Sequence, residues 1–389
     1  MKILLTGAHF TPAQAVIEEL QVLNSQALQD DKIEIVYVGR TTTREGDSTP
    51  SVESEVLPKL RVKFVPITAG RIRKVFDIWT IISLLKIPIG FIQAPFILLS
   101  ENPDVIVSFG GYVAVPVVIW GWLLSKPIIV HEQTLVTGLA NSISNLFATK
   151  IAVSFKKENS FEGEKIVLTG NPMRKELVEG SNSAKSDPEI RQVIAQAKKE
   201  KLPLIYVTGG NQGSHTINLA VSEILPNLTL KAVVIHQTGD SEYQDYEHLL
   251  EKQSGLKKPE HYLVRKWIEV NDLAQILKKC DLVVSRAGAN TLLELAYFAI
   301  PTLVIPLPIT NKNEQLQNAT FFQKSGLCEL LFQSQLNGKN LQKKLEQMLA
   351  DAHNLKSQAK LAKSVVIEDG AKRLSQEILI LAKKNHAQN

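Results

Sequence analysis

Short runs of β-branched and other apolar residues alternate with stretches of helical periodicity along most of the chain, in two successive series. The first series of expected strands comprises residues 2–5, 32–38, 62–65, 104–109, 127–132 and 150–155. The second series comprises residues 203–207, 231–237, 262–264, 281–285 and 301–306. Strands that alternate with helices are typical of βαβ units, whose parallel sheets are covered by helices on both faces. The sequence therefore predicts an α/β fold with two doubly wound domains.

The length of the chain and a polar, turn-rich segment near its middle both indicate two domains. A chain of 389 residues suits two domains of roughly 100 to 200 residues each, and the polar, turn-rich run 170–189 is the expected linker. We expect a first domain at residues 1–165 and a second at residues 166–369. A final helix at about 370–389 could pack back onto the first domain. A cleft between domains is the usual place for a ligand site.

The composition excludes several classes of protein. With 44 Lys and Arg against 39 Asp and Glu, and 44% hydrophobic residues, the chain is neither a disordered tail, a collagen-like chain nor a polytopic membrane protein. Its two cysteines, Cys280 and Cys328, lack metal-ligand spacing and predict neither disulfides nor zinc. The apolar run at residues 1–5 is too short for a secretory signal, so we expect a cytosolic chain. The net charge of +5 suits anionic phosphates or an anionic membrane surface better than nucleic acid.

One apolar stretch, residues 71–99, stands apart from the rest. Lysine, proline, glycine and glutamine interrupt it, so we expect no continuous membrane-spanning helix. Two interpretations remain open: a buried pair of crossover helices, or an exposed apolar patch beside Arg71, Arg73 and Lys74 that meets anionic headgroups.

The first strand leads directly into the segment TGAHFTPAQ at residues 6–14. Glycine permits close backbone approach there, and a following helix presents free N–H groups to an anion. The alternative is an ordinary capped helix with Thr11 as N-cap and Pro12 at its first position. His9, at the mouth of this turn, could act as a base near neutral pH or bind phosphate.

The second series of strands contains two similar loops, each of which connects a strand to a helix. Residues 205–218, IYVTGGNQGSHTIN, place Gly209, Gly210 and Gly213 between a strand and a helix. Residues 285–296, SRAGANTLLELA, again follow a strand, so N–H groups near residues 289–291 could hold a diphosphate. Glu294 could accept from a ribose diol, or form a capping box with Thr291.

Residues 306–319, PLPITNKNEQLQNA, supply amides that suit sugar hydroxyls at a strand's carboxyl end, where α/β sheets bind ligands. No DxD, HExxH or Walker motif occurs, which disfavours a metal-held nucleotide sugar and an NTPase. Helix N-termini and basic side chains would then meet the charge of a leaving diphosphate.

Seven segments in order resemble one family closely: 108–116 (SFGGYVAVP), 131–141 (HEQTLVTGLAN), 168–176, 207–214, 236–240, 285–295 and 306–319. The chain resembles the UDP-N-acetylglucosamine:undecaprenyl-diphospho-muramoyl-pentapeptide N-acetylglucosaminyltransferases, which make lipid II, over about residues 3–330. The resemblance implies a GT-B fold of two Rossmann-like domains with an interdomain cleft. It also implies an inverting, metal-independent transfer without a cofactor, at the cytoplasmic face of the cell membrane, with stretch 71–99 as the membrane patch.

The resemblance also implies roles for individual residues. His9 is the leading catalytic base, with Glu132 and His131 as alternatives. The residues implied for the lipid-linked muramoyl-peptide acceptor are Thr6, Gly7, Tyr112, Thr134 and Asn141. The residues implied for UDP-GlcNAc are Arg174, Gly209, Gly210, Asn211, Gly213, Ile268 by the uracil, Ala289, Asn290, Thr291, Glu294 on the ribose, and Gln315 on the sugar.

The chain departs from the family pattern at several positions, and these keep other functions open. Ala8 replaces a loop glycine, Thr134 an asparagine, Asn211 a serine, and Asn313-Glu314 an Asp-His pair. The alternatives are a transferase with another lipid acceptor of the diacylglycerol type, a UDP-GlcNAc epimerase, and a non-catalytic binding protein.

Overall fold

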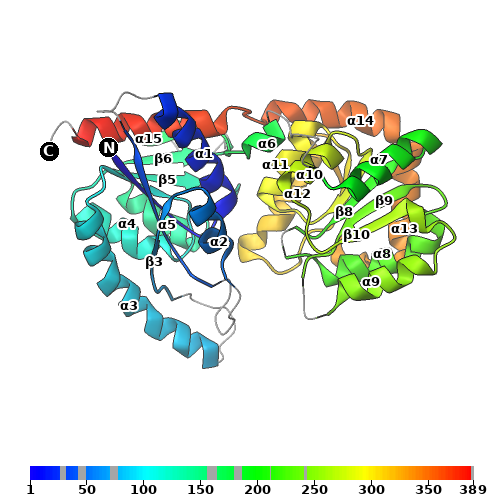
Figure 1. Ribbon diagram of the computed structural model, residues 1–389, viewed down its shortest axis with the longest axis horizontal. Coiled ribbons are helices and arrows are strands. Elements are labelled where there is room, and N and C mark those ends of the chain that lie inside the picture. Colours follow the sequence, from blue (N-terminus) through cyan, green and yellow to red (C-terminus); the bar gives the residue numbers. More distant parts are fainter. Residues whose placement is uncertain are drawn as a thin grey trace. The chain divides into compact units, whose positions relative to one another are not determined.

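The computed structural model describes residues 1–26, 32–42, 50–70, 78–155, 164–178, 186–210, 212–240 and 243–386, without the side chains of residues 78–82 and 311. The chain forms two compact units. Unit 1 comprises Met1–Arg174 and Ile367–Asn389, and unit 2 comprises Lys175–Val366. Figure 1 shows helices packed around the strands in each unit.

The sheet of unit 1 is parallel throughout, with strand order β3-β2-β1-β4-β5-β6-β7. Its strands are β1 (Lys2–Thr6), β2 (Glu34–Gly39), β3 (Lys63–Pro66), β4 (Val105–Ser108), β5 (Ile128–Glu132), β6 (Lys150–Val153) and β7 (Ile166–Leu168). The order reverses between β1 and β4, where Ile3 pairs with Val105. Ligands of open α/β sheets bind at the carboxyl ends of strands beside such a reversal.

The sheet of unit 2 repeats this topology, with strand order β10-β9-β8-β11-β12-β13, again all parallel. Its strands are β8 (Leu204–Thr208), β9 (Val233–Gln237), β10 (Tyr262–Arg265), β11 (Leu282–Ser285), β12 (Thr302–Val304) and β13 (Cys328–Leu330). The reversal lies between β8 and β11. The glycine-rich loop that follows β8 and the SRAG loop that follows β11 therefore begin at the ends of neighbouring strands.

Helices occupy most of the remaining described chain. Unit 1 contains α1 (Phe10–Gln26), α2 (Val52–Lys59), α3 (Ile78–Glu101), α4 (Ala114–Leu123), α5 (Leu139–Phe147) and α15 (Gly370–His386). Unit 2 contains α6 (Lys175–Val178), α7 (Pro188–Glu200), α8 (His215–Leu228), α9 (Asp245–Ser254), α10 (Val270–Leu277), α11 (Ala289–Phe298), α12 (Glu314–Lys324), α13 (Gly338–Ala350) and α14 (Ala352–Leu361). Short 3₁₀ turns lie at η3 (Pro259–His261), η4 (Asn311–Asn313), η5 (Gln333–Gln335) and η6 (Ala362–Val365).

The division between the units differs from the boundary expected at residues 165/166. The first compact unit ends at Arg174, inside the expected linker. Strand β7, which the sequence analysis missed, pairs with β6 and is the last strand of the first sheet. Helix α15 belongs to unit 1 because its apolar face, including Leu374 and Ile378, is buried in the core beside α1.

The described part of the apolar stretch, residues 78–99, contradicts the expected buried helix pair and the expected interruption. Residues 78–101 form one helix, α3, that continues through Pro88 and Pro95, so neither a helix pair nor an interruption is present within these residues. Ser83–Glu101 is long and apolar enough to cross a membrane by length and composition, with a mean hydropathy of 1.6, and 22% of it is buried. Arg71, Arg73 and Lys74 lie outside the described residues.

Helix α3 has two different faces. Ala94 and Leu98 are buried in the core of unit 1, and the side-chain oxygen of Gln93 accepts from Thr68 N at 2.8 Å. Large apolar side chains point outward at helical spacing: Leu85, Ile89, Ile92, Phe96 and Leu99. We call these five residues the α3 stripe. The stripe is an exposed apolar surface on a helix that is otherwise fixed to the fold.

Candidate active site

The loop after β1 forms the first part of the candidate acceptor site. Gly7 has φ of +142°, and a Cβ there would lie 2.8 Å from the carbonyl carbon of Phe109, so only glycine suits this close approach. The Gly7 carbonyl accepts from the Tyr37 hydroxyl at 2.9 Å, and Ala8 N donates to Gly110 O at 2.8 Å. The loops after β1 and β4 are therefore joined at the topological reversal.

Helix α1 begins two residues earlier than a Thr11 N-cap requires, so that expectation is wrong. It starts at Phe10, which places Thr11 and Pro12 within its first turn. His9 directly precedes this helix, and its side chain is exposed. The imidazole is therefore accessible at the carboxyl edge of the sheet.

A second polar cluster follows β5. Glu132 is 3% exposed; one carboxylate oxygen lies 3.0 Å from the Thr134 hydroxyl, and the other accepts from Asn141 Nδ2 at 3.1 Å. The structure thus brings together Glu132, Thr134 and Asn141. Thr134 contacts Glu132 directly at the position where the family pattern has asparagine.

Several buried polar atoms near these loops lack partners. In the described chain, Thr6 Oγ1, Gln133 Oε1 and Asn141 Oδ1 are buried without a hydrogen bond. Buried polar groups are normally paired, so these three atoms are exceptions, and they lie near the carboxyl ends of strands, where α/β sheets bind ligands. Gln133 was not among the residues expected at the site, although it lies in the HEQ segment.

Tyr112 is held by Arg40, which was not among the residues expected at the site. Arg40 Nη1 donates to the Tyr112 hydroxyl at 2.7 Å, and its guanidinium carbon lies 5.3 Å from the centre of that ring. This contact fixes Tyr112 directly after the Gly110-Gly111 turn.

His131 is less accessible than His9. Its side chain is 2% exposed, whereas that of His9 is exposed; desolvation lowers the pKa of both imidazoles to about 4, so the two histidines differ in accessibility and not in pKa. The Nε2 atom of His131 lies 3.4 Å from both Gly170 O and Ser154 Oγ. His131 is therefore a neutral, packed group inside unit 1.

In unit 2, the loop between β8 and α8 is tightly folded. Gly213 has φ of +73°, and a Cβ there would lie 1.8 Å from Thr238 O, which excludes any side chain. Gly210 N donates to Thr208 Oγ1 at 3.0 Å, and Gly210 O accepts from Gly213 N at 3.1 Å. Gly209 lies against Gly213 and Ser214. Asn211 lies outside the described residues.

The helix after β11 presents its N-terminus to the same edge of the sheet. Gly288 is the N-cap of α11, and Ala289, Asn290 and Thr291 are its first three residues. Because Thr291 lies inside the helix, the capping box of Thr291 with Glu294 is excluded. The three N–H groups are placed as an anion site requires, and Glu294, 8% exposed, follows one turn later.

Gln315 joins two of these strand ends. Its Oε1 atom accepts from Leu307 N at 3.0 Å and from Ala287 N at 3.3 Å. The acceptor oxygen is therefore occupied, and the amide N–H₂ group is the part of Gln315 that can serve a sugar hydroxyl.

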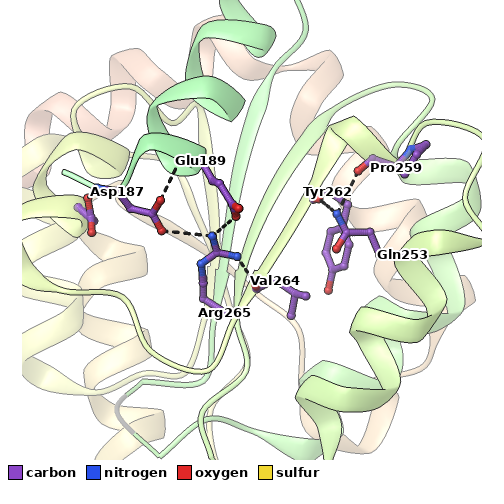
Figure 2. A network of polar contacts seen from close by, with 8 residues as sticks. Asp187, Glu189, Gln253, Pro259, Tyr262, Val264 and Arg265 are labelled. Atoms are coloured by element: carbon purple, nitrogen blue, oxygen red, sulfur yellow. Dashed lines mark hydrogen bonds and ion pairs between the residues drawn. The ribbon is translucent and has the colours of Figure 1, made fainter.

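Two further expected residues lie apart from these loops in the chain. Ile268 follows β10 and is 4% exposed. Figure 2 shows how β10 is fixed before it: Arg265 lies between Asp187 and Glu189, bonds Asp187 at 3.2 Å and donates to Val264 O at 3.0 Å. Arg174 is the last residue of unit 1, whereas the other residues expected to hold UDP-GlcNAc belong to unit 2.

Arg286 was not among the residues expected at the site. It lies in the SRAG segment, is 7% exposed, and its guanidinium donates to Ser214 and Thr216 at the start of α8. Its position in the sequence, between an apolar strand and the glycine before the next helix, could have indicated that it lies at the site.

Comparison with known proteins identifies the class and then the family. The glycosyltransferase family 28 N-terminal domain matches residues 6–153, and the C-terminal domain of that family matches residues 204–374. The chain is 34% identical to a UDP-N-acetylglucosamine–N-acetylmuramyl-(pentapeptide) pyrophosphoryl-undecaprenol N-acetylglucosamine transferase of Clostridium botulinum over 351 residues, 88% of this chain and 90% of the relative. A second such transferase, from Bacillus cereus, is 30% identical over 92% of this chain and 94% of its own length.

A solved structure, MurG of Acinetobacter baumannii, has the same fold: the TM-score is 0.70 at 23% identity, over 97% of this chain and 99% of that one. The fold is thus GT-B, and the protein is a family 28 glycosyltransferase. The chain belongs to the family of UDP-N-acetylglucosamine–N-acetylmuramyl-(pentapeptide) pyrophosphoryl-undecaprenol N-acetylglucosamine transferases.

Proposed function

We propose that this protein transfers GlcNAc from UDP-GlcNAc to the C4 hydroxyl of undecaprenyl-diphospho-MurNAc-pentapeptide, with inversion, to give lipid II. The observation that carries this proposal is the identity of 34% with a transferase of that name over 88% of the chain. The phosphate-type loops of unit 2 and the unpaired polar atoms of unit 1 support it.

In this mechanism the donor is held by unit 2. The N–H groups at the starts of α8 and α11 receive the diphosphate, Glu294 the ribose diol and Gln315 Nε2 the sugar. As the glycosidic bond to the diphosphate breaks, negative charge grows on the leaving oxygen. Preorganised N–H groups stabilise such charge without reorganisation.

The acceptor is held by unit 1. Its C4 hydroxyl attacks the anomeric carbon from the face opposite the leaving diphosphate, which inverts the configuration. His9 takes the hydroxyl proton, and the Glu132 carboxylate, fixed by Thr134 and Asn141, orients the acceptor.

We further propose that the transfer needs no divalent ion. Within the described ranges, no group of three or more His, Cys, Asp or Glu side chains could hold a metal ion. Transfer and UDP affinity should then be unchanged in EDTA, and loss of both in chelator, with recovery in Mg²⁺, would contradict this part of the mechanism.

We propose that the α3 stripe binds the membrane peripherally, at the face that presents the lipid-linked acceptor. The five exposed side chains form an apolar face of the kind that lies in the headgroup boundary. The opposite face packs in the core of unit 1, and Gln93 is bonded to Thr68. A helix held in this way lies on the bilayer rather than across it.

The decisive assay supplies UDP-GlcNAc labelled in the sugar together with lipid I in detergent micelles. We expect the label in lipid II. Label in free UDP-N-acetylmannosamine would support the epimerase. Transfer only to diacylglycerol would support a transferase with an acceptor of the diacylglycerol type. UDP-GlcNAc binding without turnover of any acceptor would indicate a binding protein.

A further inference from the structure

Arg286 is an unusually placed charge. It follows β11 directly, three residues before α11, and its side chain is 7% exposed. Its Nε and Nη2 atoms donate to Ser214 Oγ at 3.1 and 2.8 Å, and Nη2 also donates to Thr216 Oγ1 at 2.7 Å. Its Nη1 atom donates to Ile305 O at 3.0 Å. One guanidinium thus joins the ends of β11 and β12 to the start of α8.

All of these acceptors are neutral. Arg286 makes no ion pair in the described part of the chain, and it bonds only hydroxyl and carbonyl oxygens. Burial lowers the pKa of Arg286 to about 10, which still leaves it charged at neutral pH. A buried cation without a counter-ion is costly, and an anion bound nearby reduces that cost.

The contact with Ser214 also changes how α8 is capped. Ser214 is the N-cap of α8, and its side chain makes no capping hydrogen bond. Its hydroxyl oxygen accepts from Arg286 instead. The first N–H groups of α8 are therefore left without a side-chain cap, beside an uncompensated positive charge.

We propose that Arg286 is a positioning residue of the donor site, whose buried charge is balanced by the diphosphate of the bound nucleotide. It holds Ser214 and the start of α8 in place, and it adds long-range attraction for each phosphate. This inference rests on the proposed function, because it takes the ligand to be a nucleoside diphosphate.

The test distinguishes the effect of the Arg286 charge on phosphate binding from the effect of its hydrogen bonds on the structure of the site. Calorimetry measures the affinities of uridine, UMP and UDP for the wild-type protein, Arg286→Met and Arg286→Lys. We expect Arg286→Met to lose UDP affinity on the order of tenfold or more, UMP affinity less, and uridine affinity little. Arg286→Lys keeps the charge but not the planar fork, so its UDP affinity should be intermediate.

Lys231→Met is the matched control, since it removes one exposed positive charge from unit 2, where Lys231 pairs with Glu346. It should leave all three affinities unchanged. An equal loss for the three ligands in Arg286→Met would reduce Arg286 to a scaffold residue and overturn the proposal. Unchanged UDP affinity would overturn it as well.

A second measurement tests the proposal even if the protein does not bind UDP or if Arg286→Met does not fold. Pyrophosphate should raise the unfolding temperature of unit 2 in the wild-type protein, and less so in Arg286→Lys. If UDP does not bind but pyrophosphate stabilises in this way, the anion site stands and the nucleotide assignment fails. If pyrophosphate stabilises neither protein, the Arg286 proposal is wrong.

Discussion

At the scale of single residues, the candidate site depends on groups whose environments differ sharply. His9 is exposed beside the start of α1, whereas His131 is buried, and desolvation lowers the pKa of each imidazole to about 4. Glu132 is buried but held by two hydrogen-bond donors, Thr134 and Asn141. On the basis of accessibility we propose that the His9 imidazole takes the proton and that the fixed Glu132 carboxylate orients the acceptor.

Replacing His9 by alanine should lower turnover with little change in UDP affinity, because His9 belongs to unit 1. A general base contributes about 10² to 10⁴-fold. Steady-state transfer assays and UDP calorimetry measure the two quantities. His353→Ala, which removes an exposed imidazole of unit 2, is the control; unchanged turnover in His9→Ala would move the role to Glu132.

Replacing Glu294 by alanine should weaken UDP binding by about 1 to 3 kcal/mol, the cost of leaving buried hydroxyls without an acceptor. Calorimetry with UDP gives this value, and UDP lacking a ribose 2′-hydroxyl should show a smaller difference between the two proteins. If affinity is kept and only the unfolding temperature falls, Glu294 stabilises α11 and does not bind the ribose.

At the scale of elements, α3 shows why a helix can tolerate two prolines. A proline within a helix removes one hydrogen bond and disturbs the carbonyl four residues earlier. Pro88 is exposed, so water can satisfy the carbonyl that it leaves unpaired. Packing of Ala94 and Leu98 then holds the helix together across Pro95.

Four substitutions in the α3 stripe test membrane binding: Leu85, Ile92, Phe96 and Leu99 to Gln. These side chains are 64 to 68% exposed, so the protein should fold and bind UDP normally. Co-sedimentation with vesicles should fall, since the apolar contact with the headgroup boundary is lost. Wild-type binding should be stronger on anionic than on zwitterionic vesicles and weaker in high salt.

The matched control for this experiment is Leu219→Gln with Leu361→Gln, which removes exposed leucines from unit 2. Vesicle binding of the control should equal that of the wild-type protein. If the α3 variant binds vesicles as well as the control, the membrane surface lies elsewhere.

At the scale of the whole molecule, each unit has its own buried core and contains a buried histidine with a lowered pKa. Burial lowers the pKa of His131 in unit 1 to about 4 and that of His236 in unit 2 to about 3. Both are 2% exposed or less. Folding therefore keeps both imidazoles neutral under conditions where the unfolded chain would bind protons.

Stability should therefore fall as the pH falls below about 6.5, because only the unfolded state then takes up protons. For His131 the full loss is about 3 kcal/mol by the time the pH reaches about 4. Thermal unfolding between pH 7.5 and 5 measures the trend. His131→Asn should flatten the profile of unit 1, while exposed His353→Gln should not; a wild-type profile that is flat over this range would contradict the argument.

The sequence by itself determined the two parallel sheets, because fully buried strands such as Val105–Ser108 require continuous apolar runs. Every expected strand is present, and the glycine loops follow the strands as predicted. The missed strands, β7 and β13, have only three residues each; β12 is equally short, but it lies within the longer apolar run PTLVIP at residues 301–306. The boundary between the units was misplaced because β7 extends the first sheet.

Only the tertiary structure decided which polar groups meet. The contact of Arg286 with Ser214, and that of Arg40 with Tyr112, each join residues 72 positions apart in the chain, and local sequence cannot encode such a pairing. Composition showed that residues 78–99 are apolar, but the sheet and α4 decided which face of α3 became buried. Burial depends on what packs against a side chain, which is why the sequence supplied the candidates and the fold selected the site.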